Sequence, residues 1–216
     1  GLAFTDDVSV VLMSGAGGNL VQSLLNKTQP VNISDAIRFA VADDGVNPFH
    51  EILNVLQHFI APSDTINYGR NFFLEPPARS DGSGNYPAKH VLHIYGKRDF
   101  FAPEPNQQAL AAAMGATLLG PELTPMAGVE RQEDGELRNN IDLGGNSVTG
   151  GVVQYVPTQT EVQNEDGSTS TLDDYDGHFV SHHHATSGGS VSGIDAWRTF
   201  LVTALRDGDN VPTIKR

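Results

Sequence analysis

Short runs of apolar, largely β-branched residues recur along the chain and predict buried strands. The clearest runs are residues 8–13 (VSVVLM), 90–95 (HVLHIY) and 151–157 (GVVQYVP), and residues 116–119 form a shorter candidate. Runs this short and this largely apolar suit strands that are buried on both faces, as the strands of a parallel sheet are.

Between the first two runs, apolar residues recur with the period of an α-helix. Residues 19–26 form one helix, Asn32 caps a second, and Asn47-Pro48 opens a third, with Pro48 expected at the first helical position. The apolar stripe of the third helix consists of Phe49, Ile52, Leu53, Leu56 and Phe59. This stripe suits packing against a core, and it also suits a lid that faces lipid.

The second half of the chain alternates strands with helices. Residues 106–114 form an Ala-rich helix that ends at Gly115, and residues 194–205 form a closing amphipathic helix. The segments without either period, which we expect to be loops, are 75–87, 120–147 and the acidic 158–176. The alternation predicts an α/β fold with a parallel sheet. Because only about three strands are evident and such a sheet would keep an unpaired edge, the pattern indicates an incomplete sheet.

Composition narrows the class of partner. The 216 residues carry 13 basic and 26 acidic side chains, and this net charge of −13 argues against nucleic acid and anionic membrane surfaces. No apolar run approaches the roughly 18–20 residues that cross a bilayer. The chain has no cysteine, which excludes disulfides, zinc–thiolate sites and a cysteine nucleophile. It opens with Gly1 rather than methionine, as a trimmed chain or a proteolytic product does.

Two short motifs carry the candidate chemistry. Asp99 ends the segment 93–99 (HIYGKRD), directly after the second predicted strand, at the sheet edge where α/β folds place ligands. His178 lies 79 positions later, in the segment 176–179 (DGHF). A carboxylate can orient an imidazole as a general base, and this chain order matches the Ser…Asp…His order of one hydrolase triad. The structural alternatives are a helix-capping Asp99 and a surface His178.

The serine that should precede this pair is not evident, because the chain contains no G-x-S-x-G. The best internal candidate is Ser14, which follows the first predicted strand and precedes a helix. A nucleophile turn is crowded and needs small residues two positions to either side; Ala16 is small, but Leu12 is not. We therefore expect Ser14 to line the turn and the nucleophile to lie before residue 1. A self-contained hydrolase that uses Ser14 is the less favoured alternative.

Other polar clusters suggest ligands only weakly. The consecutive His182, His183 and His184 cannot readily converge on one ion, because neighbouring side chains point apart. The acidic segment 164–176 lacks the EF-hand spacing, and residues 15–18 (GAGG) are not followed by the residues of a phosphate-binding loop. We expect no metal and no cofactor.

The order of these motifs resembles the α/β-hydrolase family, and in particular its bacterial lipase- and esterase-like members. The strand, Asp99 and the helix at 106–114 look like the family's acid strand and the helix after it, and His178 looks like its histidine-loop residue. By the same resemblance, the first predicted strand is the strand after the nucleophile helix. Residues 18–87 are then a helical lid or cap insertion, and residues 88–216 hold the acid strand, histidine loop and closing helix.

The resemblance implies that residues 1–216 are a partial domain, the C-terminal part of an α/β-hydrolase parallel sheet completed by an N-terminal portion. It implies a serine ester hydrolase of lipase or esterase type in which Asp99 orients His178 as the base. The serine would come from the N-terminal portion of the same precursor, which is either a companion chain after proteolytic processing or a portion absent from this sequence. The substrate would be an ester or lipid. It further implies a secreted or cell-envelope protein. The alternative is a non-catalytic binding or surface-structural protein of the same fold.

Overall fold

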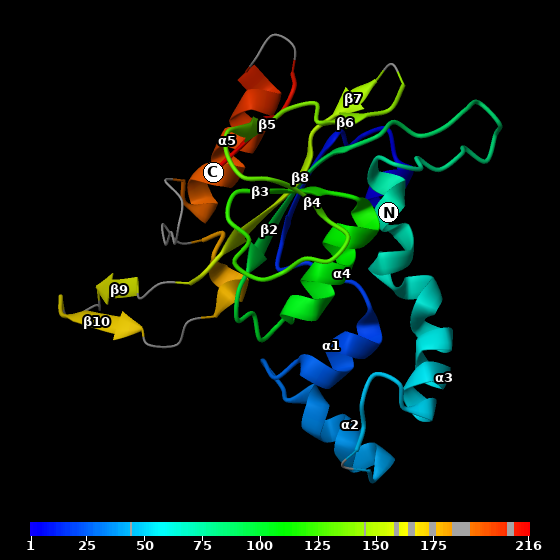
Figure 1. Cartoon of the computed structure of the whole chain (residues 1–216), viewed down its shortest axis with the longest axis vertical. Helices are drawn as coiled ribbons and strands as arrows, with labels where there is room; N and C mark the ends of the chain where they lie inside the picture. Colours follow the sequence, from blue (N-terminus) through cyan, green and yellow to red (C-terminus); the bar gives the residue numbers. More distant parts are fainter. Residues whose placement is uncertain are drawn as a thin grey trace.

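The centre of the molecule is a five-stranded sheet in the order β1-β2-β8-β3-β4, with every neighbouring pair parallel (Figure 1). In chain order its strands are β1 (Val10–Ser14), β2 (His90–Gly96), β3 (Thr117–Leu119), β4 (Glu130–Gln132) and β8 (Gly150–Tyr155). The computed structural model describes residues 1–43, 45–144, 146–157, 160–163, 167–172, 176–182, 191–206 and 210–216. The predicted α/β fold with a parallel sheet is confirmed.

Helices cover both faces of this sheet, because β2 is apolar on both faces. Val91 and Tyr95 of β2 belong to a core shared with α4 (Glu104–Met114), while Leu92 and Ile94 belong to a second core shared with α5 (Gly193–Arg206). The alternation of neighbouring residues between two cores is the strand period of two. The helices predicted at 106–114 and 194–205 are therefore the two outer layers.

Three short helices form a separate group at one end of the molecule (Figure 1). They are α1 (Leu20–Asn26), α2 (Ile33–Val41) and α3 (Glu51–Ile60), and they share a small core of Val21, Val46 and Leu53. The predicted cap at Asn32 is confirmed, and Asn19, predicted as the first helical residue, caps α1 as well. The side chains of both residues accept backbone hydrogen bonds at the helix starts. Two 3-10 segments, η2 (Ala61–Ser63) and η3 (Thr65–Phe72), then lead the chain back to α4.

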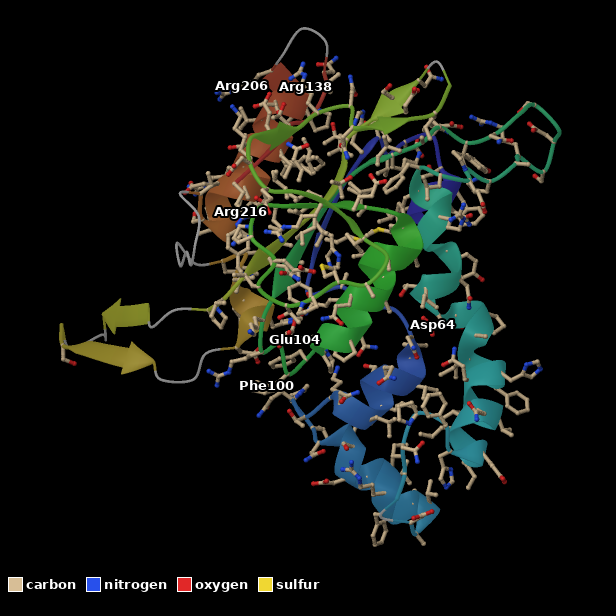
Figure 2. The ribbon with its side chains drawn as sticks, in the orientation of Figure 1. Asp64, Phe100, Glu104, Arg138, Arg206 and Arg216 are labelled. Carbon is tan, nitrogen blue, oxygen red and sulfur yellow. The ribbon has the colours of Figure 1, made fainter. Side chains whose placement is uncertain are left out.

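Asp64 joins the start of α1 to α3 within this helical group (Figure 2). Its side chain is fully buried, and its two oxygens accept from the N–H groups of Asn19 (2.8 Å) and Leu20 (2.7 Å) at the start of α1. The amide of Gln57 on α3 donates to the same carboxylate at 3.1 Å. A carboxylate at a helix N-terminus compensates the unpaired N–H groups there, so Asp64 fixes the entry of α1 against α3.

The predicted start of the third helix is wrong. α3 begins at Glu51, and the ring of His50 caps it by accepting from the N–H of Ile52 at 3.3 Å. Asn47 instead forms a turn of its own, in which its side-chain oxygen accepts from the N–H of Phe49 at 2.9 Å. Pro48 therefore lies in the turn before the helix, because a local asparagine turn competes with the helical start.

The apolar stripe of α3 divides between two environments. Leu53 is 1% exposed and Leu56 packs against the same small core, whereas Phe49, Ile52 and Phe59 are 86%, 53% and 76% exposed. Packing against a core is thus confirmed for Leu53 and Leu56, whereas the lipid-facing lid stays a prediction. Within the described residues no helix is long and apolar enough to cross a membrane.

The count of about three strands is too low. Segment 120–147, expected to be a loop, contains β4, β5 (Glu136–Leu137) and β6 (Ile141–Asp142), and β7 (Ser147–Val148) begins at its end. The acidic segment 158–176 likewise contains an antiparallel hairpin of β9 (Thr160–Gln163) and β10 (Thr169–Leu172), and β11 (Ile214–Lys215) pairs with β5. Strands of two to four residues are too short for a period of two to show in the sequence.

Candidate functional site

Asp99 lies in a tight turn directly after β2. The turn begins at Arg98, which has a left-handed backbone (φ 61°), and the N–H of Arg98 donates to Oε1 of Glu104 at 2.9 Å. Oδ1 of Asp99 accepts from the N–H groups of Phe101 (2.8 Å) and Ala102 (2.7 Å). The turn therefore holds a carboxylate at the carboxyl end of the sheet, the edge at which the sequence places it.

His178 lies in a second turn, the 3-10 segment η4 (Gly177–Phe179). Oδ1 of Asp176 accepts from the N–H of His178 at 2.9 Å and from the N–H of Phe100 at 3.3 Å. One carboxylate thus joins the histidine turn to the turn that carries Asp99.

The two turns also touch through a pair of glycines. Gly177 packs against Gly96, the last residue of β2, and a Cβ on either glycine would overlap the backbone of the other. The N–H of Gly177 donates to the carbonyl of Arg98 at 3.2 Å. Only glycine permits this approach. Gly96 and Gly177 therefore allow the histidine turn to lie directly against the end of β2.

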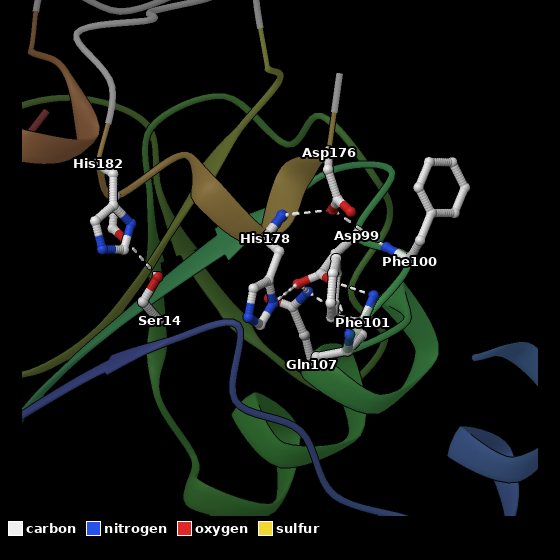
Figure 3. Close-up of polar contacts among 10 residues, drawn as sticks. Ser14, Asp99, Phe100, Phe101, Gln107, Asp176, His178 and His182 are labelled. Atoms are coloured by element: carbon white, nitrogen blue, oxygen red, sulfur yellow. Dashed lines mark hydrogen bonds and ion pairs between the residues drawn. The ribbon is translucent and has the colours of Figure 1, made fainter. Parts of the chain in front are cut away.

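These contacts bring the two predicted residues together (Figure 3). Nδ1 of His178 lies 3.0 Å from Oδ2 of Asp99. The same oxygen accepts from Nε2 of Gln107 on α4 at 3.0 Å, and this amide also donates to the carbonyl of Ala102 at 2.7 Å. The Asp99 side chain is fully buried, while that of His178 is 31% exposed. The arrangement is a buried carboxylate that holds a partly exposed imidazole.

The imidazole ring is confined on its faces and edges. Phe101 stacks on it with ring centroids 4.9 Å apart, and Phe179 meets it edge to face at 5.3 Å. On another side lies Gly15, which follows β1; a Cβ there would be 2.5 Å from Nδ1. In the described part of the chain no hydrogen bond is made to Nε2, so this nitrogen is the one left for chemistry.

The electrostatics of the pair set the tautomer. Burial raises the pKa of Asp99, and the N–H groups of Ala102 and Phe101 and the His178 ring oppose this by donating to the carboxylate. An ionised carboxylate can only accept hydrogen bonds, so the bond to Oδ2 requires the proton on Nδ1. That leaves the lone pair of the neutral ring on Nε2, where a general base needs it.

Ser14, the internal candidate nucleophile, is engaged elsewhere. Its hydroxyl donates to Oγ of Ser181 at 2.7 Å, and that oxygen lies 3.1 Å from Nδ1 of His182. Ser14 therefore lies at the end of β1 as expected, but its hydroxyl is bonded to Ser181, and no hydrogen bond joins it to His178 among the described residues.

The histidine run and the acidic segment lie partly outside the residues that the structure describes. Across the described ranges no group of three His, Asp or Glu side chains is placed to hold a metal ion. His183 and His184 lie outside the described residues, as do Asn164, Glu165 and Asp166 of the acidic segment.

Several residues around the pair were not singled out from the sequence. Gln107 donates to Asp99, and the ring of Phe101 stacks on that of His178. Asp176 belongs to the histidine motif, but its hydrogen bond to the backbone of His178 was not predicted. Gln107 sits on the buried face of an Ala-rich helix that starts five residues after Asp99, and a polar residue at such a position is the one signal that could have identified it.

Comparison of the chain with protein-family models, with curated proteins and with solved structures found no match.

Proposed function

We propose that this chain provides the acid and base of a serine ester hydrolase of α/β-hydrolase type, and that the serine comes from an N-terminal portion of the same precursor. The observation that carries the proposal is the 3.0 Å contact between Nδ1 of His178 and Oδ2 of Asp99, at the carboxyl end of a parallel sheet. A buried Asp held by donors, a His oriented by it, and a free Nε2 are the parts that general-base activation of a hydroxyl requires.

In this proposal Nε2 of His178 takes the proton from the serine hydroxyl as its oxygen attacks the ester carbonyl. The resulting imidazolium is stabilised by Asp99 and then gives its proton to the departing alcohol, which leaves an acyl-serine. A water molecule, deprotonated by the same nitrogen, attacks the acyl group, and the acid is released as the proton returns to the serine. The companion portion also provides the N–H groups that hold the oxyanion.

Three residues of the chain support this role through their contacts with Asp99. Gln107 and the N–H groups of Phe101 and Ala102 fix the carboxylate, so that the orientation of the imidazole is set before substrate binds. Such buried donors also favour the ionised carboxylate against the effect of burial.

The test is hydrolysis of p-nitrophenyl esters by the protein produced from its complete coding sequence. We expect Asp99→Asn to lower kcat by about 10³–10⁴-fold, since the loss of an orienting carboxylate costs that much in other serine hydrolases. His178→Ala should lower kcat further, by about 10⁵-fold or more. His58→Ala, which removes an exposed imidazole of α3, is the matched control and should leave kcat unchanged.

Esterase activity that survives both site substitutions would contradict the proposal. Absence of activity towards every ester would favour the non-catalytic alternative. Activity that is lost in Ser14→Ala, with the serine found nowhere else, would show a self-contained hydrolase instead.

A further inference from the structure

The turn that carries His178 continues beyond it, and its far end is held by two elements of the sheet domain. The carbonyl of Ser181 accepts from Nε1 of Trp197 on α5 at 2.9 Å. The hydroxyl oxygen of Ser181 accepts from the hydroxyl of Ser14, the last residue of β1, at 2.7 Å. His178 therefore lies between two anchored points of one short segment, Asp176 on one side and Ser181 on the other.

The hydrogen bonds around Ser181 form a chain with one direction. A hydroxyl has a single proton to donate, and Ser14 donates its proton to Ser181. The proton of Ser181 is then left for Nδ1 of His182, 3.1 Å away, which accepts it when the neutral ring has its own proton on Nε2 (Figure 3). Both polar groups of Ser181 thus have partners, as a residue that is only 5% exposed requires.

Within the described part of the chain, the contact between Ser14 and Ser181 borders a hollow. The hollow has a volume of about 450 Å³, and its lining includes both serines, His182, Leu12 of β1 and Leu201 of α5. Because a void leaves its lining without packing contacts on one side, packing alone does not fix Ser181 against β1. The hydroxyl bond is the direct link between them.

The same end of β1 also touches the imidazole ring. Gly15 follows Ser14 with a left-handed backbone (φ 57°), and a Cβ on it would lie 2.5 Å from Nδ1 of His178 and 3.1 Å from Oδ2 of Asp99. The N–H of Gly15 donates to the carbonyl of Ile94 on β2 at 3.3 Å, which fixes this backbone to the sheet. The end of β1 thus meets the histidine turn at two points, the hydroxyl of Ser181 and the ring of His178.

We infer that Ser14 and Ser181 are positioning residues for the base: their hydrogen bond holds the histidine turn against β1 and keeps the imidazole of His178 aligned with Asp99. The inference rests on the proposed function, and it gives Ser14 a role other than that of the nucleophile. A displacement of about 1 Å at a catalytic group can cost about 10²-fold in rate. One neutral hydrogen bond contributes less than this, so its loss should loosen the turn without abolishing activity.

Two measurements on the protein made from its complete coding sequence test this inference. The first is the low-field proton NMR signal of the Nδ1–H of His178, identified by its absence in His178→Ala. The second is kcat for p-nitrophenyl esters. We expect Ser14→Ala and Ser181→Ala each to broaden the signal, because the ring leaves Asp99 more often and its proton exchanges with water. Each should lower kcat about 10-fold at unchanged KM.

The pair can be separated from two independent effects by a double-mutant cycle. The two hydroxyls form one bond, so the variant that lacks both should lose no more kcat than either single variant. Ser14→Thr keeps a hydroxyl and should restore both measurements. Ser9→Ala, which removes an exposed hydroxyl just before β1, is the matched control and should change neither. Circular dichroism checks that each variant is folded, and Ser181→Ala alone tests the inference if Ser14→Ala is not.

Three results would overturn the inference. They are an unchanged signal and kcat in both alanine variants, losses that multiply in the double variant, and complete loss of activity in Ser14→Ala but not in Ser181→Ala. The first two leave the proposed function intact if activity depends on Asp99 and His178. If the signal broadens as expected but esterase activity does not depend on His178, the hold on the ring is shown and the proposed function fails.

Discussion

At the scale of residues, the pair of Asp99 and His178 could be predicted from chain order, while its surroundings could not. Each of the two lies in a motif with a recognisable turn, and the glycine contact between Gly96 and Gly177 brings the motifs together. Gln107 and Phe101 complete the site through contacts that depend on how α4 packs on the sheet. A sequence pattern contains the period of a helix but not its rotation against a neighbour, so such contacts escape prediction.

His93 on β2 provides a test of the buried sheet that does not depend on catalysis. The residue is fully buried, and burial lowers its pKa from 6.5 to about 4, although the backbone of Ala16 acts in the opposite direction. The folded protein therefore binds this proton more weakly than the unfolded chain does. Stability should be complete above about pH 6.5 and should fall as the pH drops towards 4.

For His93 alone, we expect the free energy of unfolding to fall by about 2 kcal/mol between about pH 7 and about pH 4.5. Urea titrations at the two pH values measure the free energy of unfolding of the wild type and of His93→Leu. The carboxylates titrate alike in both proteins, so the free energy of unfolding should fall by about 2 kcal/mol less in the variant than in the wild type. Equal losses in the two proteins would show that His93 is not buried as described.

At the scale of elements, the long helices and buried strands follow from the sequence, and the short exposed elements do not. β2, α4 and α5 have apolar patterns long enough to identify. β4 to β7 and the β9–β10 hairpin are two to four residues long, and their pairing is decided by tertiary neighbours. The predicted start of α3 is wrong for a local reason. Asn47 forms a side-chain turn before the helix, and Pro48 lies in this turn rather than at the first helical position.

The apolar stripe of α3 is buried at some positions and exposed at others. Substitutions along it should therefore differ in their effect on the free energy of unfolding. Leu53→Ala removes a side chain that is 1% exposed, and we expect it to lower the free energy of unfolding by about 2–4 kcal/mol. Phe59→Ala removes one that is 76% exposed and should change that free energy by less than about 0.5 kcal/mol.

Both α3 substitutions leave alanine in the same helix, and leucine and phenylalanine differ in helix propensity by less than about 0.7 kcal/mol. This difference is smaller than the one expected from burial. Urea unfolding of the two variants gives the comparison. A larger loss for Phe59→Ala than for Leu53→Ala would mean that α3 packs with its other face inward.

At the scale of the whole molecule, the parallel sheet, two covering helix layers and a helical group at one end agree with an α/β fold. The sheet order adds what the sequence could not provide: β1 is an edge strand of apolar composition, and the Asp99–His178 pair lies at the end of the same edge. The sequence pattern indicated an incomplete sheet because only about three strands were evident in it. The structure corrects that count, and completion of the sheet by an N-terminal portion stays a prediction.

The most direct measurement is fluorophosphonate labelling of the protein made from its complete coding sequence, with the labelled residue located by mass spectrometry. The expected result is a single labelled serine outside residues 1–216, with labelling lost in His178→Ala and retained in His58→Ala. Labelling of Ser14, labelling that persists in His178→Ala, or no labelled serine at all would contradict it.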